Sequence, residues 1–112
     1  DVTKPDSNGV FWALNYFWPG DFSEQPPAAD SLILKYGVGE THKKYATVER
    51  IVKMQISESG VEIFDSAPIQ LKLLKDDVSR NWEGIAKLEN KGFLIVTDTF
   101  PTTILGFVEY SE

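Results

Sequence analysis

Residues 81–110, NWEGIAKLENKGFLIVTDTFPTTILGFVEY, decide the fold, because they predict three short strands joined by two tight connections. The expected strands cover residues 81–88, 93–97 and 103–110. The turn Glu89-Asn90-Lys91-Gly92 joins the first two, since glycine supplies the positive φ that a hairpin turn needs. The continuous apolar run Phe93–Val96 predicts a strand buried on both faces between two layers of sheet.

The composition is that of an ordinary single domain of 112 residues with a net charge of −6. This acidic balance argues against a nucleic-acid partner, because such binding requires Lys and Arg to neutralise phosphates. The chain has no cysteine, which excludes disulfides and thiol chemistry but does not fix the compartment. No apolar run approaches the roughly 20 residues of a membrane span. No signal peptide is present, but one could have been removed before Asp1, and we expect a periplasmic or extracellular location.

An internal repeat extends the pattern to the start of the chain. Residues 9–17, GVFWALNYF, align with residues 92–100, GFLIVTDTF, at an offset of 83 residues. Apolar positions fall on apolar positions, and Asn15 falls on Asp98. Residues 32–36 resemble residues 103–107, which predicts a third strand in the first copy.

The rest of the chain completes the first copy. Residues 18–30 and 37–47 are polar or Pro/Gly-rich and predict two inserted loops. Residues 50–56 alternate between apolar and polar side chains, as in a half-buried strand, and Ser57–Gly60 predicts a hairpin turn. A charged linker, with room for a short helix within residues 72–80, leads into the second copy.

Repeated short antiparallel sheets are typical of the blades of a β-propeller. We therefore expect an all-β fold of two consecutive blades, residues 1–74 forming the first and residues 81–112 an incomplete second. Two blades alone would expose wide apolar faces. The expected partners are the remaining blades of a larger ring or identical subunits. A compact sandwich or barrel without a ring is the third alternative.

Three segments carry a family resemblance. Trp82–Ala86 (WEGIA), Lys91–Asp98 (KGFLIVTD) and Ile104–Phe107 (ILGF) resemble a blade of the bacterial phytase-like and esterase-like six-bladed propellers. Residues 11–20 resemble the preceding blade of such proteins. The resemblance implies a calcium-dependent hydrolase of phosphate or ester substrates, but propellers also host lectins and scaffolds, so the fold does not fix the function.

The resemblance also implies a metal site. Related hydrolases use the carboxylate of an EG dipeptide as a calcium ligand in the central channel, which here is Glu83. Asn15 and Asp98 follow equivalent strands, and their oxygens suit Ca²⁺. All three side chains are equally compatible with capping turns and strand ends. The remaining ligands would come from other blades.

Two further residues are candidates for binding a ligand. Trp18, beside Pro19-Gly20, could stack on a carbohydrate or another small molecule, whereas Trp12 is expected to be buried between the blades. His42 forms a local basic patch with Lys43, Lys44 and Arg50 that could meet a phosphorylated substrate, although charged loops are usually only solvated.

No catalytic residue is assigned. The chain has no Gly-x-Ser-x-Gly elbow, and one histidine gives no triad. Two functions stay open. The first is a segment of a calcium-dependent, phytase-like hydrolase. The second is a non-catalytic propeller that binds a carbohydrate or protein, including a multimer of two-blade subunits.

Overall fold

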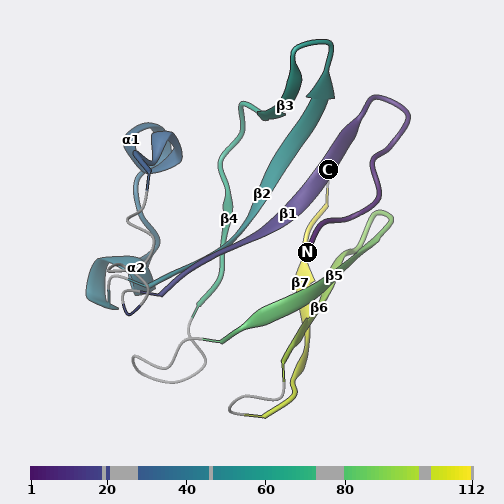
Figure 1. Cartoon of the computed structure of the whole chain (residues 1–112). Coiled ribbons are helices and arrows are strands. Elements are labelled where there is room, and N and C mark those ends of the chain that lie inside the picture. The colour runs from purple at the N-terminus through teal and green to yellow at the C-terminus, as the bar shows by residue number, and fades with distance from the viewer. Residues whose placement is uncertain (19, 21–27, 46, 73–79, 99–101, 112) are drawn as a thin grey trace.

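A computed structural model describes residues 1–18, 20, 28–45, 47–72, 80–98 and 102–111 of the chain. Two antiparallel sheets pack against each other, and two short helices lie beside the first sheet (Figure 1). The prediction of an all-β fold is confirmed in part, because most of the described elements are strands but two short helices are also present. No helix in the described ranges has the length and apolar character needed to cross a membrane.

The first sheet is built on two long paired strands, β1 (Val10–Phe17) and β2 (Val48–Ser57). The other edge of β2 pairs with β3 (Gly60–Ile63) and, further along, with β4 (Ile69–Gln70). The start of the chain pairs with the free edge of β1, where the N–H of Thr3 donates to the carbonyl of Trp12 at 2.8 Å.

The second sheet has the order β5 (Trp82–Leu88), β6 (Gly92–Thr97) and β7 (Leu105–Glu109). These strands lie within the ranges predicted from residues 81–110, apart from a start one residue earlier for β6. The hairpin turn between β5 and β6 has positive φ at Asn90 (57°) and at Gly92 (141°). The predicted turn chemistry is therefore present, with Asn90 as a second left-handed residue.

The core lies between the two sheets. Trp12 and Ile51 from the first sheet meet Ile85, Phe93 and Ile95 from the second. The prediction that Trp12 is buried is confirmed, since its exposure is 2% and its ring packs edge-on against Phe93 of the other sheet. The prediction that the strand through Phe93 is buried on both faces is wrong. Its alternate residues, Leu94 and Val96, are only half-buried, because they lie on the outer face of the second sheet.

A buried carboxylate also joins the sheets. Glu49 of β2 is 4% exposed and lies on the same face of the sheet as Ile51. Its side chain accepts hydrogen bonds from the backbone N–H of Arg80 at 2.6 Å and from the indole Nε1 of Trp82 at 3.0 Å. Burial raises the pKa of Glu49 above its ordinary value, although both hydrogen bonds act in the opposite direction.

The structure corrects the prediction for residues 32–36. They form helix α1 (Ser31–Tyr36), not a third strand. Asp30 caps this helix by accepting from the N–H groups of Leu32 and Ile33, and Gly37 ends it with φ of 75°. The second predicted loop also contains a helix, α2 (Glu40–Tyr45). In the first sheet, β2 takes the place of the third strand that residues 32–36 were expected to form. Most of the short helix considered within residues 72–80 lies outside the described residues.

The repeat is present in the connectivity, but its alignment shifts by one residue. In the first hairpin the N–H of Gly9 donates to Asp6 O at 3.0 Å, and the equivalent bond in the second runs from Lys91 to Leu88 at 3.1 Å. The carbonyl of Gly9 then accepts from Ile56 of β2, as the carbonyl of Lys91 accepts from Tyr110 after β7. Gly9 therefore corresponds to Lys91, 82 residues later, and not to Gly92.

This shift of one residue exchanges the faces of the strand. With Gly9 on Lys91, Trp12 corresponds to Leu94 rather than to Ile95. Trp12 is in the core, whereas Leu94 lies on the outer face of the second sheet. The two sheets consequently pack front to back: the face that the first sheet buries is the face that the second sheet leaves exposed.

Candidate functional site

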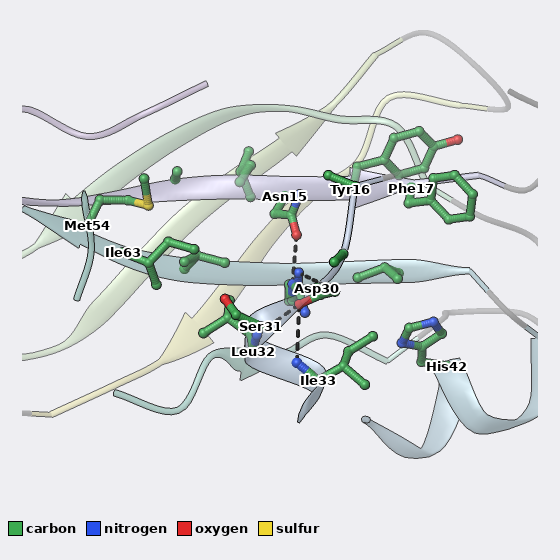
Figure 2. A pocket seen from close by; sticks show the side chains of 17 residues that line it. Asn15, Tyr16, Phe17, Asp30, Ser31, Leu32, Ile33, His42, Met54 and Ile63 are labelled. Atoms are coloured by element: carbon green, nitrogen blue, oxygen red, sulfur yellow. Dashed lines mark hydrogen bonds and ion pairs between the residues drawn. The ribbon is translucent and has the colours of Figure 1, made fainter. Parts of the chain in front are cut away.

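A pocket of about 580 Å³ lies on the outer face of the first sheet, between β1 and β2 on one side and α1 on the other (Figure 2). Its volume is in the range typical of small-molecule sites. Strand residues contribute an apolar wall, and the segment before α1, its first turn and one residue of α2 complete the lining. The lining side chains include Ala13, Val48, Val52, Met54 and Ile63 from the strands, and Leu32, Ile33 and His42 from the helices.

Arg50 is the charged centre of this pocket. It follows Glu49 on β2, and because successive side chains of a strand point to opposite faces, it enters the outer face while Glu49 enters the core. Its Nε donates to Asn15 Oδ1 at 2.6 Å, and its Nη2 donates to Asp30 Oδ2 at 2.6 Å. The guanidinium is therefore fixed between β1 and the start of α1.

Asp30 holds this arrangement together by using both carboxylate oxygens. Oδ1 accepts from the N–H groups of Leu32 and Ile33 and caps α1, while Oδ2 accepts from Arg50. Burial alone would raise the pKa of Asp30, but the hydrogen bond from Arg50 and the two backbone N–H bonds lower it below its ordinary value. Asp30 therefore stays ionised and balances the charge of Arg50.

One atom of the site has no partner. The side chain of Arg50 is only 8% exposed, and its Nη1 is buried and makes no hydrogen bond within the described residues. A buried N–H without an acceptor costs about 1–3 kcal/mol. Since Arg50 lines the pocket and its other nitrogens are held, Nη1 is a fixed donor beside the pocket, and an oxygen of a bound molecule reaches it only where a neighbouring side chain moves aside.

His42 lies on α2 at another part of the lining (Figure 2). Burial lowers the pKa of His42 below its ordinary value, and the positive charge of Arg50 lowers it further, while Asp30 acts weakly in the other direction. The imidazole is therefore uncharged near neutral pH. With Arg50 and Asp30 in balance, the pocket carries no net charge.

The structure brings two of the five predicted site residues into this pocket, Asn15 and His42. Asn15 Oδ1, proposed as a calcium ligand, accepts from Arg50. Trp18 does not line the pocket and is 48% exposed, as a surface contact would require.

The other two predicted residues belong to the second sheet and share one neighbour. The side-chain amide of Asn81 donates to Glu83 Oε1 at 2.6 Å, and the carbonyl of Asn81 accepts from the backbone N–H of Asp98 at 3.0 Å. Glu83 and Asp98 are both exposed. Among the described residues no group of three or more His, Cys, Asp or Glu side chains is arranged to hold a metal ion.

Sequence analysis missed Asp30 as a site residue and named Arg50 only as part of a basic patch with His42. Asp30 carried a usable signal, because an Asp directly before the apolar segment Ser31–Tyr36 is a helix N-cap pattern. The place of Arg50 at the centre of the pocket carried no signal, since a charged residue that alternates along a half-buried strand is ordinarily expected to face solvent. Comparison of the chain with protein-family models, with curated proteins and with solved structures gave no match.

Proposed function

We propose that this chain is a binding module for a small amphipathic molecule, one that has an apolar body and an oxygen acceptor at one end. The single observation that carries this proposal is the buried Nη1 of Arg50, which has no acceptor among the described residues and belongs to a side chain that lines a largely apolar pocket. A carbonyl or carboxylate oxygen at this position would satisfy the donor, and the aliphatic chain or ring of the ligand would cover Val52, Met54 and Leu32.

The lining favours such a ligand over a carbohydrate. A sugar presents several hydroxyl groups, each of which needs a polar partner when it is buried. Here the side-chain oxygens of Asn15 and Asp30 already accept hydrogen bonds from Arg50, so few polar groups remain for a polyol. The apolar wall instead gains about 25 cal/mol for each Å² of apolar surface that it removes from water.

Preorganisation supports the same proposal. The guanidinium is held by Asn15 and Asp30 before any ligand arrives, so little side-chain entropy is lost on binding. The acceptor oxygen would relieve an existing cost rather than break a hydrogen bond within the protein.

The test uses octanoate and octylammonium, which share a tail and differ in the head group. In ¹H–¹⁵N spectra of the labelled chain, octanoate is expected to shift the Arg50 Nε–H signal and the amides of β1 and β2, saturably and at millimolar concentration. Octylammonium has no acceptor and is expected to leave them unchanged. Equal shifts with both probes, or none with either, would contradict the proposal.

Two variants sharpen this experiment. Ala13→Phe places a ring in the pocket from β1 and is expected to abolish the octanoate shifts. Leu34→Phe is the matched control, because Leu34 is 85% exposed and does not line the pocket. If Ala13→Phe binds octanoate as the unaltered chain does, the ligand occupies another place.

A second candidate is the phytase-like propeller that the sequence resemblance implies. Two observations favour it. Both sheets have the same order of three strands, with the 1–3 segment, β1 and β2 matching β5, β6 and β7. They also pack front to back, which is the arrangement by which further sheets could be added around an axis. The partners would be remaining blades or identical subunits, and the location would be periplasmic or extracellular.

In this second candidate Glu83, Asn15 and Asp98 contribute ligands to a Ca²⁺ site that other blades complete, and the substrate is a phosphate or ester. Two measurements test it on the assembled ring, formed with the remaining blades or with identical subunits. The melting temperature should rise at millimolar calcium and fall with chelator, and a panel of generic phosphates and esters should be hydrolysed. An unchanged melting temperature together with no turnover would contradict it, while leaving octanoate binding unaffected.

A further inference from the structure

β7 is the last strand of the second sheet, and one of its edges is open. Within the described residues β7 pairs only with β6. The corresponding strand of the first sheet, β2, is covered on both edges, by β1 on one side and by β3 and β4 on the other. In the described part of the chain, the second sheet therefore lacks the fourth strand that its counterpart has.

The backbone of β7 presents hydrogen-bonding groups at this edge. The carbonyl of Ile104 accepts from Thr97 at 3.0 Å, and the N–H of Tyr110 donates to Lys91 at 3.1 Å, so these residues point toward β6. Because the direction alternates along an antiparallel strand, the N–H and C=O groups of the odd-numbered residues point away from β6. These residues are Leu105, Phe107 and Glu109.

The side chains at the edge are apolar and exposed. Leu105 is 70% exposed and Phe107 is 55% exposed. Both lie on the outer face of the sheet, since Val108 and Tyr110 pack against the core. An exposed apolar edge strand without Pro or Lys is a ready template for pairing with another strand.

We propose that β7 pairs with β7 of a second copy of this chain, antiparallel and about a two-fold axis at Gly106. This pairing joins two three-stranded sheets into a continuous sheet of six strands. In this register Leu105 lies opposite Phe107 of the second copy, and each pair exchanges two backbone hydrogen bonds. The proposal rests on the edge of the second sheet and is independent of the pocket.

The charge of β7 favours this register for the pair with a second copy. Glu109 is the only charged residue of β7, and with the axis at Gly106 it lies opposite Thr103. With the axis at Phe107, Glu109 would lie opposite Leu105 and its carboxylate would be partly buried beside an apolar side chain. A strand that is antiparallel to itself about a two-fold axis also needs no other partner.

The first test is the oligomeric state by sedimentation velocity from micromolar to millimolar concentration. We expect a reversible dimer. Phe107→Lys should give a monomer, because the lysine would lie opposite Leu105 of the second copy. Val61→Lys is the matched control, since Val61 is 61% exposed on β3, and it should leave the dimer unchanged.

A double variant tests the register. Leu105→Glu with Phe107→Lys places a glutamate opposite a lysine twice across the axis at Gly106, so the dimer should return. With the axis at Phe107 the two lysines would face each other, and the variant would stay monomeric. In a half-labelled mixture, isotope-filtered NOE spectra of the unaltered chain should show contacts between Leu105 methyl groups and the Phe107 ring.

The outcomes decide the proposal. A monomer at all concentrations overturns it and leaves the edge of β7 to a strand from a longer polypeptide. A dimer that persists in the well-folded Phe107→Lys variant also overturns it, because that dimer uses another surface.

Discussion

The indole of Trp82 donates a 3.0 Å hydrogen bond to the carboxylate of Glu49, across the two sheets of the domain. Glu49 belongs to the first sheet and Trp82 to the second. Their hydrogen bond is a polar contact between two sheets whose core is otherwise apolar. A buried carboxylate needs such donors, because its desolvation is costly without them. The stability of the interface between the sheets therefore depends on this pair as well as on the aromatic core.

Replacing Trp82 with Phe should destabilise the domain by about 1–3 kcal/mol, because one oxygen of buried Glu49 loses its donor. Urea unfolding followed by circular dichroism measures the difference. Trp18→Phe is the matched control, since Trp18 is 48% exposed, and it should change the free energy of unfolding by less than about 0.5 kcal/mol. Equal effects of the two variants would contradict the role of the hydrogen bond.

The raised pKa of Glu49 predicts a pH dependence of stability. In the window between the ordinary Glu pKa, about 4.3, and the raised pKa of Glu49, the folded state holds more protons than the unfolded state. The contribution of Glu49 to the free energy of unfolding therefore falls as pH rises through this window. Urea titrations at several pH values should show this fall in the unaltered chain and its loss in Glu49→Gln.

Removing Asp30 should cost more than removing any exposed partner of an ion pair. Asp30→Ala deletes the N-cap of α1 and leaves the buried charge of Arg50 without its carboxylate, which together cost about 3 kcal/mol. Asp65→Ala is the comparison, because Asp65 pairs with Lys35 on the surface and should show no measurable change. Chemical denaturation of both variants measures the contrast, which a similar loss in each would refute.

His42 should change the free energy of unfolding with pH in the direction opposite to Glu49. Its folded pKa lies below the ordinary value of about 6.5, so the unfolded state binds more protons between these two values. The free energy of unfolding should therefore rise with pH up to about 6.5, and His42→Gln should remove this rise. An NMR titration of the imidazole checks the direction independently, and a pKa above the ordinary value would contradict it.

The second sheet was predictable from sequence because its signals are local. Alternating side chains, the turn at Asn90 and Gly92, and the break after β6 all lie within residues 81–110. The same local signals failed at residues 32–36, where an apolar run suits a strand or a buried helix equally. The Asp30 cap and the Gly37 end decided in favour of the helix.

The site was less predictable because it depends on tertiary pairing. Asn15 and His42 were singled out for other chemistry, and both line the pocket only because α1 and α2 fold onto the sheet. The roles of Glu49 and Arg50 depend on which face of β2 meets the second sheet. No short-range pattern in residues 48–57 specifies that face, since Val48, Val52 and Met54 are as apolar as the core-facing Ile51.

The side chains of Glu49 and Arg50 point to opposite faces of the first sheet, and this disfavours a shifted register of β2. If β2 slipped by one residue against β1, every side chain would change faces. The guanidinium of Arg50 would then enter the apolar core, away from Asn15 and Asp30, and the carboxylate of Glu49 would move to the outer face, away from the N–H of Arg80 and the indole of Trp82. Both charged groups would lose their partners, so two consecutive charged residues penalise the shifted pairing that an apolar strand would tolerate.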